Sequence, residues 1–526
     1  MAEKTNILRT AFTVGALTSL SRVLGFVREM FQSRYIGAGV EQSAFTLAFS
    51  VPNMVRKLFG EGALTAAFVP IFKGECETAS HESAERLARA VMTTVLLSLV
   101  MLMLLGFAAL DVLAGFRVKL GIVDVYRYEL LIDLLKTLLP YMIFICGAAF
   151  GMGVLNALGK FKAAAFMPTL LNVFWIAALA TLAFFPGLPI RQRIRWVAVA
   201  ILGAGAVQMA FMFRCMAKAG MRPWPTFRGW GEAKVRLVWK NLGIAALGAG
   251  AIQVNYMLDQ VLAQWASPWA AGVIGYAERL MDLPLGVIGV AFGTVLLPTF
   301  AGFFARGDVA SARSALAASV RNIMIVMLPA AVGMAVLAED MTAVIYQGGG
   351  FDATATMRVS RALAVYATGL GFFSFQKSLV PWFQAQNDMK TPLRVSVATV
   401  CVNATLNILA VILLPVEWRH VGLAASTVVC SIAGCALLMV AARRMNGSLG
   451  LGTLVRPVAK ILGAALAMGA VLLLLKQVLP AADMTRVGQR VLRLLAEIAA
   501  GAVAYGVLAW FLFRAELRLA LRRRLK

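Results

Sequence analysis

Arginines within long apolar segments are the first feature of this sequence that could carry chemistry. Arg22 and Arg28 lie in SRVLGFVRE, Arg56 lies in PNMVRKLFGEG, and Arg279 lies in YAERLMDLP. A guanidinium group at the centre of a bilayer costs roughly 2.5–3.5 kcal/mol on insertion scales, so these side chains should not face lipid. A water-filled cavity lined by them would suit an anionic headgroup, because the guanidinium fork donates paired hydrogen bonds to phosphate oxygens.

Acidic residues in the same segments allow a second interpretation, an internal network of ion pairs. The acidic partners lie at helical spacing, in the pairs Arg22–Glu29, Lys57–Glu61 and Arg279–Asp282. Such pairs would neutralise part of the charge without any substrate. They leave Arg28 and Arg56 without an obvious partner, and from the residues alone both interpretations stay open.

The composition indicates a membrane protein. Of 526 residues, 60% are hydrophobic and 14% are charged, whereas a soluble domain has roughly 45–50% apolar and 25% charged residues. The net charge of +25 would suggest nucleic acid in a soluble protein. Here the basic residues lie mostly between hydrophobic segments, which favours anionic membrane lipids as partners and excludes nucleic acid.

Fourteen membrane-spanning helices are expected, since about 20 apolar residues are needed for each span. The apolar N-terminal stretch continues through Arg22 and Arg28 without a cleavage pattern, so it is predicted to be the first span and not a signal peptide. The basic segment 221–240, which carries tryptophans, is predicted to lie at the membrane interface. The expected spans are 10–36, 44–73, 88–115, 130–158, 164–186, 193–216, 238–266, 272–303, 316–340, 359–383, 391–415, 420–442, 456–478 and 489–513.

The distribution of basic residues predicts the orientation. With the N-terminus inside, the inner segments carry 30 of the 50 Lys and Arg, the outer segments carry 14, and six lie within helices. Because Lys and Arg are enriched on the cytoplasmic side, both termini are predicted to be cytoplasmic.

A weak internal repeat predicts the division into domains. The stretch 63–72 resembles 291–300 at an offset of 228 residues, and the same offset sets Lys162 over Lys390. Helices 1–6 would then match helices 7–12, as two lobes related by an axis along the membrane normal. The predicted parts are a lobe at 1–220, the connector at 221–240, a second lobe at 241–445, and helices 13 and 14 with a basic tail at 446–526.

Several of these stretches resemble the MurJ/MviN family, within the multidrug/oligosaccharidyl-lipid/polysaccharide exporter superfamily. They occur in the expected order over most of the chain. Members of the family flip lipid II, an undecaprenyl diphosphate that carries a disaccharide-pentapeptide, from the cytoplasmic to the outer leaflet. The matching stretches are SRVLGFVRE at 21–29, GAG at 37–39, VPNMVRKLFGEGALTAAFVPIF at 51–72, PTLLN at 168–172, YAERLMDLPLGVIGVAFGTVLLP at 276–298 and NDMKTP at 387–392.

The resemblance implies an all-α protein of the bacterial inner membrane, with two six-helix lobes around a central cavity. It implies that the last two helices form a groove for the lipid tail and that the protein works as a monomer. By motif match, the expected substrate-binding residues are Arg22, Arg28, Arg56 and Arg279, with Ser21, Glu29, Asn172 and Asp282 beside them.

The resemblance has departures and one further implication. Many members have Asp where this chain has Ser43, for which Glu41 is a possible substitute. Some members bind sodium, and oxygen ligands suit such a hard cation. Ala404 lacks the hydroxyl that some relatives offer, and Asp388 could equally be a solvated loop residue. The matching positions here are Asp259, Asp388, Gln384, the Val400 carbonyl and Asn403.

No motif of an enzyme stands out. The sequence has no GxxxxGK loop, GxSxG elbow or HExxH pair, so transport would depend on an ion gradient or on the membrane potential. Two alternatives remain: an exporter of polysaccharide-lipid units or drugs from the same superfamily, and a membrane enzyme acting on a polyprenyl lipid. The arginines argue against cationic drugs, and Glu278 with Asp282 is the only weak candidate for a catalytic pair.

Overall fold

A computed structural model describes residues 2–58, 63–116, 124–478 and 487–522. Within these ranges the chain is built of α-helices, and the only β-bridge joins Gly348 to Phe351. The all-α prediction is confirmed for this part of the chain. The helices form two compact units, one comprising Met1–Gln264 with Gly348–Phe351 and the other Trp265–Gln347 with Asp352–Lys526.

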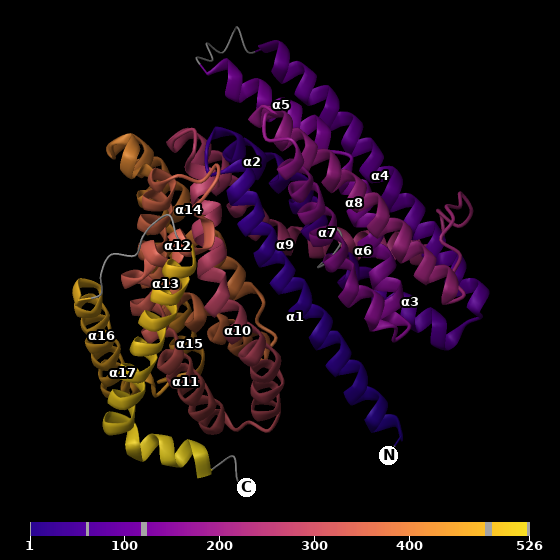
Figure 1. The fold of residues 1–526 in the computed structure, drawn as a ribbon. Helices are drawn as coiled ribbons and strands as arrows, with labels where there is room; N and C mark the ends of the chain where they lie inside the picture. Colours follow the sequence, from indigo (N-terminus) through magenta and orange to yellow (C-terminus); the bar gives the residue numbers. More distant parts are fainter. Residues whose placement is uncertain (1, 59–62, 117–123, 479–486, 523–526) are drawn as a thin grey trace. The chain divides into compact units, whose positions relative to one another are not determined.

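The first unit has a core of aromatic and aliphatic side chains between neighbouring helices, with α1 along α7 and α6 along α8 (Figure 1). Phe45 and Phe49 both contact the Trp175 ring edge-on, at centroid distances of 5.6 and 5.3 Å. The helices are α1 (Ala2–Ile36), α2 (Val40–Val55), α3 (Ala63–Thr78), α4 (His81–Phe116), α5 (Val125–Leu138), α6 (Tyr141–Ala157), α7 (Phe161–Thr181), η2 (Leu182–Phe184), α8 (Ile190–Lys218) and α9 (Ala233–Ala266).

The second unit is arranged around one central helix, α13, which packs against α10, α11 and α15. Trp382 and Phe383 near the end of α13 are fully buried, and Trp382 packs edge-on against Phe300 of α10 at 5.4 Å between centroids. The helices are α10 (Ala270–Ala305), α11 (Val309–Val336), α12 (Ala338–Tyr346), α13 (Ala353–Gln384), α14 (Lys390–Leu413), α15 (Val416–Asn446), η3 (Leu451–Leu454), α16 (Val455–Val478) and α17 (Val487–Arg522).

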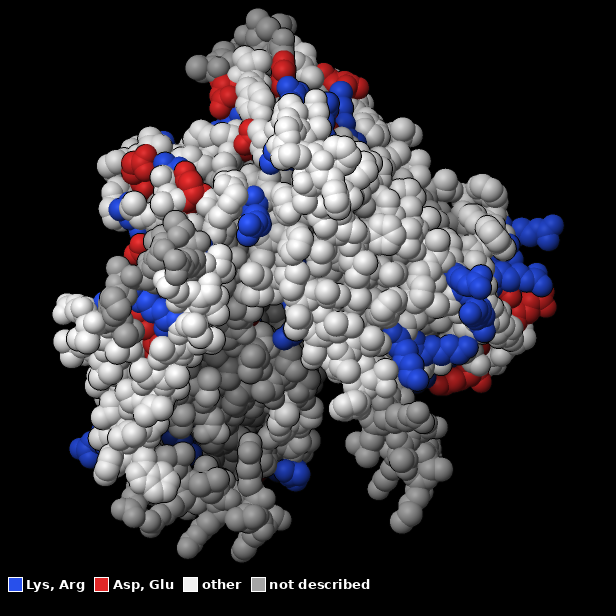
Figure 2. All heavy atoms as spheres, in the orientation of Figure 1, with Lys and Arg blue, Asp and Glu red and all other residues white. Residues whose placement is uncertain are grey.

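Each expected span coincides with one helix or with two consecutive helices. The span expected at 130–158 is divided into α5 and α6 at Pro140, whose ring cannot donate a backbone hydrogen bond. Within the described ranges, nine helical segments are long and apolar enough to cross a membrane. Figure 2 shows wide areas of surface that carry no charged side chain. The chain is therefore a multi-pass membrane protein.

Helix-ending turns of one type lie at two positions that the repeat offset of 228 residues relates. Gly159 (φ +74°) and Asn387 (φ +58°) both adopt the left-handed conformation, and Asn387 is the only described residue other than glycine with positive φ. The backbone hydrogen bonds also correspond: Lys160 donates to Leu155 and Asp388 donates to Phe383, at 2.8 and 3.0 Å. This bond pattern closes the C-terminal end of a helix. The turns after α6 and α13 are thus of the same type, which also ends α8 at Gly220 and α10 at Gly307.

A second turn explains the first glycine of the GAG sequence at 37–39. In the first unit, the backbone N–H of Gly350 donates to the Arg34 carbonyl at 2.8 Å, at the end of α1. Gly37 has φ +84°, and a β-carbon placed there would collide with the Gly350 carbonyl. Only glycine fits both the dihedral angle and the close approach of the two backbones.

Replacing Gly37 by Ala should therefore lower the thermal unfolding midpoint and the folded yield. The left-handed conformation alone costs about 1–2 kcal/mol for a residue with a β-carbon, and the collision adds to this. The matched control is Gly74→Ala, because Gly74 is in α3 with no atom within 4 Å of an added β-carbon. Alanine favours helix there, so stability should be unchanged or higher. Equal midpoints for the two variants would contradict the assignment of this turn.

Candidate functional site

Arg28, one of the predicted substrate-binding arginines, is positioned by α1 and α7 together. Its Nη1 donates to Asn172 Oδ1 at 3.1 Å, and its Nη2 pairs with the Glu29 carboxylate. The guanidinium carbon lies 4.4 Å from the centroid of the Trp175 ring. Only 13% of the side chain is exposed. Arg28, which had no obvious partner in the sequence, thus has an amide, a carboxylate and an aromatic face around it.

A second set of hydrogen bonds holds these partners in place. Asn172 Nδ2 donates to the Ser21 carbonyl at 2.9 Å, which turns the amide oxygen towards Arg28. Trp175 Nε1 donates to Gln32 Oε1 at 3.0 Å, and Gln32 Nε2 donates to Gln42 Oε1 at 2.8 Å. Arg28 Nε is buried and has no hydrogen-bond partner among the described residues. The site therefore presents a pre-oriented cation with a remaining donor.

Arg56 and Arg22 belong to the same unit. Arg56 follows the last residue of α2, and its Nε donates to Asn53 Oδ1 at 2.9 Å. The neighbouring Lys57 ammonium lies 5.0 Å from the centroid of the Tyr256 ring. Arg22 is exposed on α1. Glu61, the predicted partner of Lys57, lies outside the described residues.

The remaining two predicted substrate residues, Arg279 and Asp282, belong to the second unit. Both are exposed and lie three residues apart on α10. The adjacent Glu278 is half-buried, and its carboxylate accepts a long hydrogen bond from the Tyr366 hydroxyl at 3.5 Å. The structure thus brings Ser21, Arg28, Glu29 and Asn172 together, and sets Arg279 beside Asp282.

Gln264 contacts Ser43, the position at which many family members have Asp. Gln264 Nε2 donates to the Ser43 carbonyl at 2.7 Å and to its hydroxyl at 3.2 Å. Gln264 Oε1 in turn accepts from Arg127 at 3.1 Å. Glu41 instead accepts from the Tyr126 hydroxyl at 2.8 Å. Because an amide both donates and accepts, Gln264 links a serine to an arginine. Whether Glu41 replaces the missing Asp stays a prediction.

Of the residues expected to bind sodium, those in the second unit do not all come together. Asp388 precedes α14, while Val400 and Asn403 lie within this unbroken helix, about 15 and 20 Å along its axis from the first residue. Asn403 Oδ1 accepts from Asn407 at 3.0 Å. Gln384 is the last residue of α13, and Asp259 belongs to the first unit. The Asp388 carboxylate and the Val400 carbonyl cannot share one cation, and we derive no ion-coupled step from these residues.

Asp388 instead forms a cap before α14. Its Oδ1 accepts from the backbone N–H groups of Lys390 and Thr391, both at 3.0 Å. Hydrogen bonds from Thr391 lower the pKa of this carboxyl below its usual value. The stability that a depressed pKa confers is present at neutral pH and is lost as the pH falls through that pKa.

The Asp388→Ala variant should therefore unfold more easily at neutral pH, by about 1 kcal/mol, the usual cost of a lost cap. The difference from wild type should shrink on acidification. Asp388→Asn keeps an acceptor oxygen and should stay close to wild type. Thermal unfolding in sodium and in potassium buffers checks both points. A sodium-specific stabilisation that both variants lose would identify a cation ligand instead.

The fold defines a class, the all-α multi-pass membrane proteins. The fold is similar to the structure "Lipid II flippase MurJ, inward closed conformation", with TM-score 0.77 and 20% identity over 96% of this chain and 99% of that chain. It is also similar to an inward-facing multidrug resistance MATE family transporter, with TM-score 0.63 and 16% identity over 84% of this chain and 98% of that chain.

The sequence then decides the family. The family model "Lipid II flippase MurJ" matches residues 32–486, and the chain belongs to this family. A probable lipid II flippase MurJ of Rhizobium tropici is 31% identical, over 89% of this chain and 87% of the relative. That of Rickettsia prowazekii is 30% identical, over 80% of this chain and 81% of the relative. The predicted family resemblance is confirmed.

Proposed function

We propose that this protein transports lipid II from the cytoplasmic to the periplasmic leaflet by alternating access, and so supplies peptidoglycan synthesis. The observation that carries the proposal is the Arg28 site. It places a guanidinium group, 13% exposed, between α1 and α7 and orients it by an amide and an indole. A buried cation that is held in one orientation suits the diphosphate of the substrate.

The diphosphate would bind through charge-assisted hydrogen bonds. Arg28 is fixed before substrate arrives, so little side-chain entropy is lost on binding. Arg22, Arg56 and Arg279 would supply further donors, and Asp282 and Glu29 would keep the unoccupied site from carrying a large excess of positive charge. Membership of a flippase family supports a transporter and not an enzyme.

The proposed architecture has fourteen spans in one working monomer of the bacterial inner membrane. Two six-helix lobes, 1–220 and 241–445, would surround the cavity, and the helices in 446–526 would guide the lipid tail. Without a nucleotide-binding motif, an ion gradient or the membrane potential would drive transport.

The proposed orientation has both termini in the cytoplasm, because the inner segments carry 30 of the 50 basic residues. A cytoplasmic reporter fused to Lys526 should be active, and a reporter that needs the periplasm should be silent. Single cysteines in the connector 221–240 should likewise be protected from thiol reagents added outside. A periplasmic signal at Lys526 would overturn the orientation.

The test of function is rescue of a bacterium depleted of its own lipid II flippase. Expression of this chain should restore growth and should make lipid II accessible at the outer face. An exporter of the same superfamily with an unrelated cargo serves as the control and should do neither. Correct membrane insertion without accessible lipid II would overturn the proposal and favour another lipid-linked cargo.

A further inference from the structure

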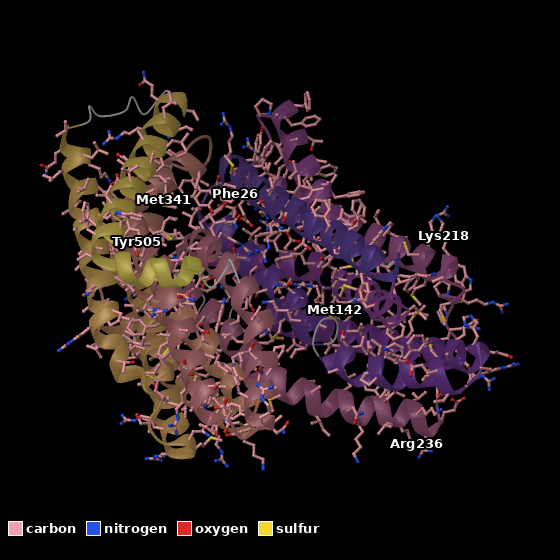
Figure 3. All side chains as sticks on the ribbon, turned by 90° about the horizontal axis from the view of Figure 1, so that it is seen from below. Phe26, Met142, Lys218, Arg236, Met341 and Tyr505 are labelled. Carbon is pink, nitrogen blue, oxygen red and sulfur yellow. The ribbon has the colours of Figure 1, made fainter. Side chains whose placement is uncertain are left out.

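A group of five charged residues lies where α12, α16 and α17 meet in the second unit. The three helices share a small apolar core formed by Leu337, Met468, Leu472 and Leu494, against which Met341 of α12 and Tyr505 of α17 pack (Figure 3). The same three helices carry five charged residues: Asp340 of α12, Lys476 of α16, and Arg490, Arg493 and Glu497 of α17. We refer to these five residues as the α12–α16–α17 charge cluster.

Two of the three cations in the cluster have a carboxylate partner. The Lys476 ammonium pairs with Asp340 and also donates to the Val336 carbonyl at 3.3 Å. Arg493 Nε donates to Glu497 Oε1 at 3.0 Å, and the Glu497 side chain is fully buried. Each carboxylate in the cluster is therefore already engaged by one cation.

Arg490 is the third cation, and no ion pair joins it to a described residue, although Glu497 Oε2 is also buried without a hydrogen-bond partner in the described chain. It is 8% exposed and lies on the buried face of α17 that also carries Leu494 and Glu497. Its Nη1 donates to the Ala343 carbonyl at 3.2 Å, while its Nε is buried without a hydrogen-bond partner in the described chain. A buried cation is costly unless an anion accompanies it. The cluster holds three cations and two carboxylates, so one negative ligand would balance its charge.

The position of the cluster relative to its helices indicates the source of that ligand. Arg490 is in the first turn of the membrane-spanning segment Val487–Leu512, and Lys476 is in the last turn of Leu451–Val478. The ends of spanning helices lie at the depth of the lipid headgroups. An anion at this depth is most readily the phosphate of a membrane lipid, which a guanidinium fork matches.

We infer that the α12–α16–α17 charge cluster binds the phosphate group of an anionic phospholipid, with Arg490 as the ligand-binding residue. The lipid supplies the counter-charge that Arg490 lacks and joins α17 to α12. This inference depends on the chain being a membrane protein and not on the cargo it transports. Loss of the lipid site and loss of flipping can therefore be distinguished.

The experiment uses the full-length protein in nanodiscs of phosphatidylglycerol or phosphatidylcholine. Lipids retained after extraction into detergent are counted by native mass spectrometry, and thermal unfolding is followed in parallel. The variants are Arg490→Gln and Arg490→Lys. The matched control is Arg443→Gln, which removes an exposed arginine from the last turn of α15.

Wild type and Arg443→Gln should retain phosphatidylglycerol in preference to phosphatidylcholine, and phosphatidylglycerol should raise their unfolding midpoint. Arg490→Gln should retain phosphatidylglycerol about tenfold less, the loss expected for one charge-assisted hydrogen bond. Arg490→Lys should retain an amount of phosphatidylglycerol between those of wild type and Arg490→Gln, because lysine keeps the charge without the planar fork of donors.

Unchanged phosphatidylglycerol retention in Arg490→Gln would overturn the inference. If that variant is not recovered folded, wild type still decides, since equal retention of the two lipids by wild type would also overturn it. The inference would also be overturned if inorganic phosphate, added to wild type in lipid-free detergent, raised the unfolding midpoint as much as phosphatidylglycerol does. The ligand would then be a soluble anion. Lipid II transport in the rescue assay serves as the separate readout of function.

Discussion

Replacing Arg28 by Ala is expected to lower lipid II translocation by about 10- to 150-fold and to abolish growth rescue, while the protein still folds. This fold-change corresponds to one hydrogen bond to a charged group, worth roughly 1.5–3 kcal/mol. The reason for the large effect is the fixed geometry of the site. Asn172 and Trp175 hold the guanidinium in one orientation, so no other side chain of α1 can take its place.

Two further variants separate charge from geometry at this site. Arg28→Lys keeps the charge without the planar fork, so it should recover only part of the rate. Arg443→Ala, at an exposed position on α15, should translocate like wild type. The contrary outcome has two parts: Arg28→Ala loses folded yield, and the double variant Arg28→Ala with Glu29→Gln regains both yield and transport. In that case Arg28 is only the structural partner of Glu29.

The sequence predicted the helices well because hydropathy depends on local composition. Every segment expected to span lies in one helix or two consecutive helices, even where a break such as that at Pro140 was not foreseen. Nine helical segments of the described chain are long and apolar enough to cross a membrane. The contact between Gly37 and Gly350 could not be predicted in this way. It joins residues more than 300 positions apart, and its only local sign was an unexplained glycine.

The Arg28 site was predicted in part. The motifs pointed to Arg28, Glu29 and Asn172, and the structure places these side chains together. Trp175 was missed, although it follows Asn172 by three residues and so lies on the same helical face. That spacing, with an aromatic ring near a candidate arginine, is a signal that sequence reasoning could use.

The expected cation site shows where motif matching fails. Residues matched one at a time carry no information on the distances between them. Asp388 and Asn403 match family positions, but the unbroken helix α14 separates them. Helical rise converts fifteen residues into about 22 Å. A check of the ligands against predicted helix boundaries would have revealed the conflict from the sequence.

Arg279 is the second residue whose removal should have a large effect, and a double variant tests its role. Arg279 and Asp282 are exposed on α10. If α10 spans the membrane as proposed, its charged side chains should avoid lipid, so exposed ones should face water. An ion pair in water contributes roughly 0–1 kcal/mol, which makes a purely structural role for Arg279 a weak one. Arg279→Ala should therefore leave the folded yield near wild type and lower translocation by about 10- to 150-fold.

Adding Asp282→Asn to Arg279→Ala distinguishes substrate binding from ion pairing. If Arg279 binds the diphosphate, neutralising Asp282 cannot replace the lost donor, and the double variant should remain as impaired as the single one. If Arg279 serves only to compensate Asp282, the single variant should show reduced yield, and the double variant should recover yield and transport together. Folded yield and lipid II accessibility, measured on the same membranes, give both quantities. Recovery of transport in the double variant would show that Arg279 is a partner of Asp282 and not a ligand of the substrate.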